Sequence, residues 1–318
     1  MTARVIDGLA YAAELRAEVA EDVRRLAGQC VVPCLATVYA GDDYAAAAYE
    51  RRVRRLAGEL GCRYVSERLS ANAAEADVVA CVGKLGADPR VSGILVLRPL
   101  PTGVSEAAVY RALDPAKDIE AVHPVNAGLL ALGRPRYVPS TPASVFHMLD
   151  RYLRDAGADP TEVYARSVIV IVGRSNNVGK PAMLLALARG ATLVSCDVNT
   201  FKAGLLHEHT CRADILIVAV GSPGLITGEH VKPGAIAIDV GINPVQDSHA
   251  SRVRLVGDLD FDSVAARAGA ISPVPGGVGP ITDVWLLRNT VTAARYAARA
   301  AASADVSFIR PGALAAVP

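Results

Sequence analysis

Two glycines bracket a short segment whose residue types suit phosphate binding. Gly173 and Gly179 flank residues 174–178, an apolar run precedes them, and Lys180-Pro181 opens a helix-like stretch. Gly173 permits a tight turn off a strand, Gly179 permits close helix packing, and N–H groups at a helix start attract phosphate. Ser175 stands where the GxGxxG pattern has its second glycine, so spacing alone leaves a nucleotide site and a plain strand–helix turn equally open.

Asp197 follows the next apolar run, Ala191–Cys196. A carboxylate at the end of the second strand of a mononucleotide-binding half accepts hydrogen bonds from an adenosine ribose and repels a 2′-phosphate. Val198, Asn199 and Thr200 follow without an adjacent Arg or Lys. This pattern favours NAD over NADP as the cofactor. The alternative is that Asp197 is only a polar residue at a strand end.

Strand-like and helix-like segments alternate through both halves of the chain, which is typical of βαβ units and parallel sheets. The predicted strands are 31–40, 62–69, 93–97, 167–172, 191–196, 215–220 and 235–240, and the predicted helices are 44–60, 74–85, 181–188 and 283–302. Residues 114–142, rich in Pro, Gly and Asn, predict a loop-dominated connector. We interpret His207 and His209 as part of a solvated loop and 303–318 as a flexible tail.

Composition narrows the function classes. The 318 residues are 52% hydrophobic and 20% charged, with a formal net charge of +1. No basic block with interleaved aromatic residues is present, so nucleic acid and anionic membranes are poor partners. The apolar runs are too short to span a membrane, and the N-terminus lacks a signal pattern, so we expect a cytoplasmic protein. The six cysteines form no CxxC pair, and we expect no metal site.

Five segments, in order along the chain, resemble the signatures of one family. They are Ser92–Pro101 (SGILVLRPLP), Lys117–Gly128 (KDIEAVHPVNAG), Pro139–Pro142 (PSTP), Val172–Pro181 (VGRSNNVGKP) and Ser272–Thr282 (SPVPGGVGPIT). The resemblance, to the bifunctional methylenetetrahydrofolate dehydrogenase/cyclohydrolase family, extends from about Thr37 to Asn289.

The resemblance implies two α/β domains with a cleft between them, the second a Rossmann-like doubly wound parallel sheet. Residues 1–141, completed by the helix 283–302, would bind the folate, and residues 142–282 would bind the dinucleotide. It also implies a homodimer.

The same resemblance assigns roles to individual residues. Tyr49 and Glu120 would serve catalysis. The substrate would be held by Tyr49, Val53, Leu97, Glu120, Pro275, Gly276 and Gly277. The dinucleotide would be held by Gly173, Arg174, Ser175, Val178, Gly179, Asp197, Val220, Gly221, Ile242, Gly277 and Thr282.

The departures from the family lie in these sites. Val53 occupies the position of the family's lysine, Leu97 that of its glutamine and Glu120 that of its aspartate, whereas Tyr49 is kept. Asp197, Val198 and Asn199 replace the His-Ser-Arg sequence of NADP-dependent members. Arg98 is unexpected, and it either contacts the folate's glutamyl tail or is a solvated charge.

Two reactions make different demands on these positions. Hydride transfer from the methylene carbon of methylenetetrahydrofolate to nicotinamide needs positioning, whereas hydrolysis of the methenyl product needs proton transfer. Loss of general acid–base help costs about 100- to 10,000-fold in rate. We therefore expect an NAD-dependent dehydrogenase that has lost the cyclohydrolase step. The alternatives are a full bifunctional NADP-dependent enzyme and a non-catalytic or repurposed NAD- or folate-binding paralogue.

Overall fold

The computed structural model describes residues 2–41, 43–247 and 252–306. The described residues form two compact units. The three-stranded unit contains Val19–Ile119 and residues 287–306, and the six-stranded unit contains residues 2–18 and Glu120–Leu286. Each unit is treated by itself below, and α1 (Gly8–Ala27) and α12 (Val278–Val306) contribute residues to both.

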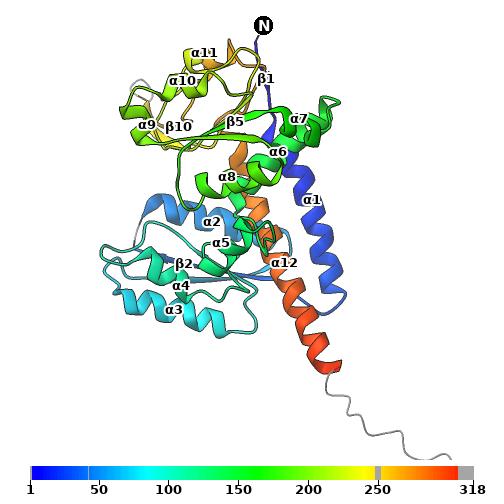
Figure 1. Cartoon of the computed structure of the whole chain (residues 1–318). Helices are drawn as coiled ribbons and strands as arrows, with labels where there is room; N and C mark the ends of the chain where they lie inside the picture. The colour runs from blue at the N-terminus through cyan, green and yellow to red at the C-terminus, as the bar shows by residue number, and fades with distance from the viewer. Residues whose placement is uncertain (1, 42, 248–251, 307–318) are drawn as a thin grey trace, which may run out of the picture. The chain divides into compact units, whose positions relative to one another are not determined.

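The three-stranded unit is a parallel sheet with helices on both faces. Its elements are β2 (Cys34–Ala40), α2 (Tyr44–Glu59), β3 (Arg63–Leu69), α3 (Glu75–Ala87), β4 (Gly93–Val96) and α4 (Glu106–Ala112). The strand order is β3-β2-β4, and both pairings are parallel. Helix α2 covers one face of the sheet, and α3 and α4 cover the other (Figure 1).

Local sequence explains why α2 lies where it does. The side chain of Asp43 accepts a hydrogen bond from Ala46 N at 2.7 Å and caps the first turn. Ala46, Glu50, Val53 and Ala57 recur at helical spacing and are buried, so one face of α2 packs against the unit. Arg54 donates to the buried Glu50 carboxylate at 2.6 Å, which offsets the cost of burying that charge.

The six-stranded unit is a doubly wound sheet. Its strands are β1 (Arg4–Val5), β5 (Val168–Val172), β6 (Thr192–Cys196), β7 (Ile215–Val218), β8 (Ile236–Asp239) and β11 (Ala270–Ile271). The order is β1-β11-β8-β7-β5-β6, with every pairing parallel. The chain leaves β5 toward β6 on one side and returns to β7 on the other, so the sheet has its topological switch point between β5 and β7.

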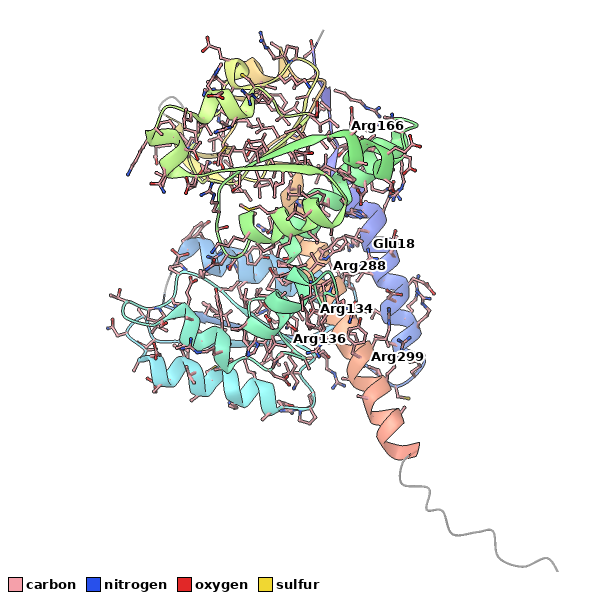
Figure 2. All side chains as sticks on the ribbon, viewed as in Figure 1. Glu18, Arg134, Arg136, Arg166, Arg288 and Arg299 are labelled. Carbon is pink, nitrogen blue, oxygen red and sulfur yellow. The ribbon has the colours of Figure 1, made fainter. Side chains whose placement is uncertain are left out.

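Helices cover both faces of this sheet, with α6 and α8 on one side and α10 and α11 on the other (Figure 1). The remaining elements of the unit are α5 (Pro124–Ala131), α6 (Ser140–Asp155), α7 (Pro160–Arg166), α8 (Gly179–Ala188), α9 (Val198–Lys202), α10 (Leu206–Thr210), the 3-10 helix η1 (Gly228–His230), α11 (Phe261–Ala265) and the antiparallel pair β9 (Asn243–Asp247) and β10 (Arg252–Val256). Arg166 ends α7 beside Glu162, 3.9 Å away (Figure 2).

The core of the six-stranded unit is built from the strands. Val170, Leu216, Val218 and Ala237 are buried in one cluster, in which Leu206 and Val264 from the helices also take part. Strands covered on both faces read as continuous apolar runs, which is why VIVIV and ILIV could be recognised as strands.

The alternating strands and helices confirm the predicted fold class of two α/β units, one of them a doubly wound parallel sheet. The compact units nevertheless depart from the predicted ranges at the N-terminus and around residue 120. Strand β1 pairs with β11, so the first residues join the six-stranded unit. The prediction that residues 1–141 bind the folate and residues 142–282 bind the dinucleotide concerns function, and it stays a prediction.

Two local predictions were wrong, and a third holds in its main feature. The connector 114–142 is dominated by loops as predicted, but it also contains α5, whose start is fixed by Pro124 at its first position and by the ring of His123, which accepts from Val125 N at 3.1 Å. His207 and His209 lie in the short helix α10 rather than in a loop. The last helix begins at Val278 rather than at Asp283, because Pro280 falls in its first turn, where no N–H is needed.

The predicted tail 303–318 was wrong for its first residues, because α12 continues to Val306. The rest of that segment lies outside the described residues. None of the helices in the described part of the chain combines the length and the apolar character that a membrane span requires.

Candidate functional site

The turn after β5 brings two backbones together at the switch point. Gly173 has φ +116°, and a Cβ on it would collide with the carbonyl of Ala219, which follows β7. A Cβ on Gly179 would collide with the backbone of Gly173 itself. Both glycines are therefore required by close backbone approach, as their positions in the sequence predicted. The result is a narrow turn at the start of α8, a place where nucleotide phosphates bind in folds of this kind.

Ser175 has a role that the sequence did not reveal. Its hydroxyl accepts from Val178 N at 3.2 Å and from Gly179 N at 3.3 Å. Two of the N–H groups that could attract a phosphate at this helix start are therefore already hydrogen-bonded within the turn. A phosphate would compete with the Ser175 hydroxyl for them, or would use other donors of the turn.

The carboxylate of Asp197 already accepts several hydrogen bonds from within the protein. It caps α9 by accepting from Asn199 N at 3.0 Å and Thr200 N at 3.1 Å, and it pairs with Arg174 Nη1 at 2.9 Å. The backbone N–H of Thr200, and then the charge of Arg174, hold the pKa of Asp197 below its usual range. The structural alternative for Asp197, a polar strand end, thus gains support as a helix cap. The carboxylate stays charged beside the turn in either case.

Arg174 is fixed by the same strand end. Besides Asp197 it donates to Ser195 Oγ and to Ser195 O, each at 2.7 Å. A planar guanidinium that binds a carboxylate and a carbonyl together is strongly oriented. Arg174 and Asp197 were predicted separately as cofactor-binding residues, and the structure brings them together as an ion pair.

Two buried carboxylates that the sequence reading missed organise the loops after β7 and β8. Asp258 accepts from the backbone N–H groups of Val220, Gly221 and Ser222 at 2.7, 3.0 and 2.8 Å. Asp239 accepts from Gly241, Asp258 and Leu259 at 2.9–3.0 Å. Both side chains are almost fully buried. The sequence did contain a sign of this role. Asp239 ends the apolar strand IAID, and a carboxylate at the end of a buried strand needs hydrogen-bond donors inside the protein.

Burial dominates the ionisation of Asp239. Removal from water raises the pKa of this carboxyl to about 6, the neighbouring Asp258 acts in the same direction, and the three backbone N–H groups oppose the shift. The predicted cofactor-binding residues Val220 and Gly221 thus occupy a turn whose shape is set by buried carboxylates.

The proline-glycine loop packs against the start of α1. A Cβ on Gly8 would collide with the backbone of Gly277, and Gly276 has φ +104°. Gly277 is buried and Pro275 is exposed. On the far side of the loop, a Cβ on Gly279 would lie 3.8 Å from the Ile242 side chain, so the loop and Ile242 are neighbours. The Thr282 hydroxyl donates its proton to Val278 O, so this hydrogen bond lies within α12.

Glu120 joins two of the segments that carried the resemblance. Its carboxylate accepts from Ser140 Oγ at 2.6 Å and from Ser140 N at 3.3 Å, at the first residue of α6. A carboxylate at a helix start is stabilised by the N–H groups there. Glu120 is partly exposed, so one edge of it faces solvent in this unit.

The remaining predicted folate residues lie in the three-stranded unit. Val53 and Leu97 are buried, at 0% and 7% exposure. Leu97 N bonds to Val38 O at 2.8 Å, directly after β4. Tyr49 is half-buried, with the Arg52 guanidinium 4.9 Å from its ring centre. Arg98 lies 3.9 Å from Glu106 and is about half exposed, which favours the solvated alternative.

The structure thus groups the predicted residues into two sets. One set, in the six-stranded unit, contains all the predicted dinucleotide residues together with Glu120 and Pro275–Gly277. The other, in the three-stranded unit, contains Tyr49, Val53 and Leu97. A doubly wound sheet with a glycine-containing turn at its switch point is the architecture typical of dinucleotide-binding α/β proteins.

Comparison with known proteins identifies the family. Residues 139–298 match the tetrahydrofolate dehydrogenase/cyclohydrolase NAD(P)-binding domain, and residues 6–120 match the catalytic domain of the same family. The chain belongs to the tetrahydrofolate dehydrogenase/cyclohydrolase family.

Individual relatives agree over nearly the whole chain. The chain is 67% identical to bifunctional protein FolD 3 of Rubrobacter xylanophilus over 93% of both proteins. It is 45% identical to bifunctional protein FolD of Chloroflexus aurantiacus, over 93% of this chain and 98% of that protein. Its structure resembles that of Trypanosoma brucei methylenetetrahydrofolate dehydrogenase-cyclohydrolase, solved with NADP and an inhibitor, with 34% identity, a TM-score of 0.86 and coverage of 94% and 99%.

The close approach at the turn predicts the effect of adding one methyl group. Gly179→Ala should raise the KM for the dinucleotide at least about tenfold and lower the free energy of unfolding by about 1–3 kcal/mol, because the new Cβ meets backbone that cannot move aside. Gly83→Ala is the matched control: Gly83 lies in α3, and a Cβ there meets nothing within 4 Å. It should add about 0.5–1 kcal/mol of stability. Steady-state kinetics and urea unfolding measure both effects, and equal effects of the two substitutions would refute this account of the turn.

The raised pKa of Asp239 predicts a pH dependence of stability. Between the usual pKa near 4 and the folded value of about 6, the unfolded chain gives up its proton while the folded chain keeps it. The contribution of this group is therefore complete below pH 4 and is lost as the pH rises through 6, by about 3 kcal/mol. Asp239→Asn should remove this loss, although it also removes an acceptor for Leu259 N at every pH. Urea unfolding of both proteins from pH 4 to 7 measures the difference, and parallel profiles would contradict the assignment.

Proposed function

We propose that the protein oxidises 5,10-methylenetetrahydrofolate with a nicotinamide dinucleotide as hydride acceptor. The observation that carries this proposal is the narrow turn at the switch point, where Gly173 and Gly179 let backbone approach backbone at the start of α8. The family match of both parts of the chain supports the substrate.

The reaction asks little of the protein in proton transfer. The C–H bond of the methylene carbon breaks, its electron pair leaves as hydride, and a folate nitrogen lone pair forms the methenyl double bond. The nicotinamide ring, when bound, accepts the hydride. Tyr49 offers a half-buried ring, and Glu120 offers acceptor oxygens for the N–H groups of a pterin. Positioning of this kind supplies most of what hydride transfer needs.

NAD is the proposed cofactor, on the strength of Asp197. Its charge, held by the cap of α9, lies beside the turn and repels a 2′-phosphate. Arg174 partly offsets that charge, and the Trypanosoma brucei relative was solved with NADP. A ribose hydroxyl that bonds to Asp197 has to share the carboxylate with Arg174 and Asn199, or displace one of them.

Hydrolysis of the methenyl product is the second candidate activity. Two of the relatives named above are called bifunctional and the third is called a dehydrogenase-cyclohydrolase, which favours the alternative of the sequence analysis, a full dehydrogenase/cyclohydrolase, over the expected loss of the hydrolytic step. The expected loss is supported by Val53 and Leu97, which are buried and have no group that transfers a proton. The homodimer and the cytoplasmic location implied by the sequence remain proposals, the first testable by light scattering.

A time course of purified protein with methylenetetrahydrofolate, run with NAD and with NADP, tests the function. We expect reduction of the nicotinamide in both versions of the proposal. Added methenyl compound separates them: formyl product above the uncatalysed rate supports the bifunctional enzyme, and an unchanged rate supports the loss of hydrolysis. If neither NAD nor NADP is reduced, the proposed dehydrogenase activity is refuted.

The cofactor proposal predicts the outcome of a double substitution. Asp197→Ser with Asn199→Arg should raise the ratio of kcat/KM for NADP to that for NAD at least about tenfold, because a repulsive carboxylate is exchanged for a phosphate-binding guanidinium. Ser can still cap α9, so the local fold should persist. Asn199→Arg alone is the control, since it keeps Asp197. An unchanged ratio in the double variant would count against a ribose site at Asp197.

A further inference from the structure

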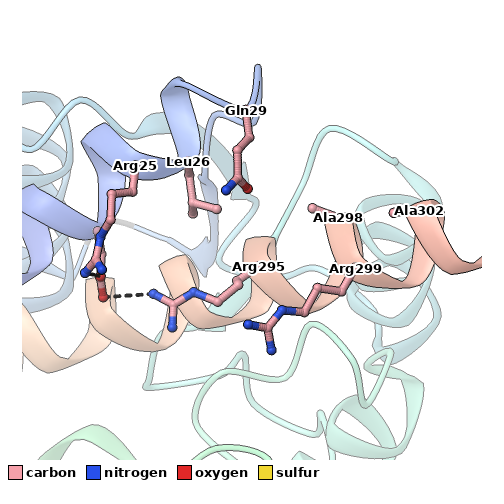
Figure 3. A pocket seen from close by; sticks show the side chains of 8 residues that line it. Arg25, Leu26, Gln29, Arg295, Ala298, Arg299 and Ala302 are labelled. Carbon is pink, nitrogen blue, oxygen red and sulfur yellow. Dashed lines mark hydrogen bonds and ion pairs between the residues drawn. The ribbon is translucent and has the colours of Figure 1, made fainter.

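A surface pocket of the three-stranded unit lies between α1 and α12. It has a volume of about 390 Å³, and arginines from both helices line it: Arg25 from α1, and Arg295 and Arg299 from α12 (Figure 3). All three belong to the same compact unit. None of the residues assigned above to the folate or to the dinucleotide lines this pocket, so the proposed function gives it no role.

One carboxylate already lies between two of these arginines. Asp22 forms ion pairs with Arg25 through Oδ1 and with Arg295 Nη2 through Oδ2, the second at 2.9 Å. The two guanidinium groups thus come from different helices and meet at one carboxylate. Charge-assisted bonds of this kind are stronger than neutral hydrogen bonds, and the guanidinium fork matches carboxylates and phosphates. The pocket therefore contains an example of the interaction that a carboxylate ligand would make.

The lining side chains carry more positive than negative charge. Three guanidinium groups and one carboxylate, that of Asp22, line the pocket, which leaves an excess of two positive charges. Arg299 follows Arg295 by four residues, so both lie on the same side of α12, about 6 Å apart along its axis. A guanidinium has five N–H donors, so each arginine can bind a further acceptor besides the partner that it already has. An anion with two charges matches this excess.

The rest of the lining suits a short carbon chain. The apolar side chains of Leu26 and Ala298 line the pocket together with the arginines, and the amide of Gln29 adds a neutral donor and acceptor (Figure 3). A ligand that joins two carboxylates through a few methylene groups can place its charges at the arginines and its chain against Leu26 and Ala298.

We propose that this pocket binds a short-chain dicarboxylate, with one carboxylate between Arg295 and Arg299 and the other at Arg25. Such a ligand contacts both helices, so its binding stabilises the packing of α1 against α12. The inference does not depend on the proposed function, because it involves no residue of the folate or dinucleotide sites and its tests require no turnover.

Calorimetric titration with glutarate is the first arm of the test. One variant is Arg295→Gln/Arg299→Gln. The control, Arg63→Gln/Arg111→Gln, removes the same charge from exposed positions of β3 and α4 in the same unit. We expect the first variant to bind glutarate about tenfold more weakly than the parent, the effect of two partly exposed ion pairs, and the control to bind as the parent does. Arg299→Gln alone, which leaves both ion pairs of Asp22 in place, should show part of this loss.

Two results of this titration would overturn the proposal. One is the absence of glutarate binding by the parent, and the other is equal weakening in both double variants. The same titration identifies the chemistry of the ligand. Butyrate, which has a similar chain and only one carboxylate, should bind the parent at least about tenfold more weakly than glutarate, because one set of charge-assisted bonds is missing. Equal affinity for butyrate, or tighter binding of inorganic phosphate than of glutarate, would refute the assignment to a dicarboxylate.

Removal of the acid gives a prediction of opposite sign. Asp22→Asn keeps the size of the side chain but releases Arg25 and Arg295 from their shared ion pair, so glutarate should bind about tenfold more tightly. Glu21→Gln is the matched control, because Glu21 is the neighbouring acid of α1 and pairs with Arg24 at 2.5 Å, and neither residue lines the pocket. Its affinity for glutarate should stay within about twofold of that of the parent. If Asp22→Asn binds glutarate no more tightly than Glu21→Gln does, the proposal fails.

Discussion

Two buried carboxylates, Asp239 and Asp258, set the shape of the loops on which the six-stranded unit's proposed cofactor site depends. Between them they accept six backbone N–H groups from the segments after β7, β8 and β10. Oriented N–H dipoles compensate a buried charge without a cation, and these hydrogen bonds hold the loops in place. The same arrangement explains two glycines, because a Cβ on Gly241 or Gly257 would collide with one of the carboxylates.

The turn after β5 likewise has no room for a Cβ at its glycines. Gly173 and Gly179 are required because backbone meets backbone there, whereas Ser175 supplies acceptors for the first N–H groups of α8. The turn is thus ordered without a ligand. An ordered turn costs less entropy when a ligand binds, but each phosphate bond that it forms at Val178 or Gly179 replaces a bond to the Ser175 hydroxyl.

Much of the fold could be predicted from the sequence, because buried parallel strands are continuous apolar runs and strand ends are marked by Gly. The roles of single polar residues could not. The cap made by Asp197, its ion pair with Arg174 and the contact of Glu120 with Ser140 join residues that are 3 to 23 positions apart in ways that no local pattern fixes. Strand β1 shows the same limit, since a two-residue strand gains its place only by pairing with β11 at the other end of the chain.

Helix α2 carries an apolar residue at the position where the resemblance places a proton-transferring one. Its buried face includes Val53, at the position where the resemblance places a lysine, and Leu97 after β4 is likewise apolar and buried. A lysine at a fully buried position costs several kcal/mol unless it is paired or loses its proton, and valine avoids that cost. Neither Val53 nor Leu97 can give or take a proton. If hydrolysis persists in this chain, as the bifunctional names of its relatives suggest, water must be activated by a group other than the side chain at position 53.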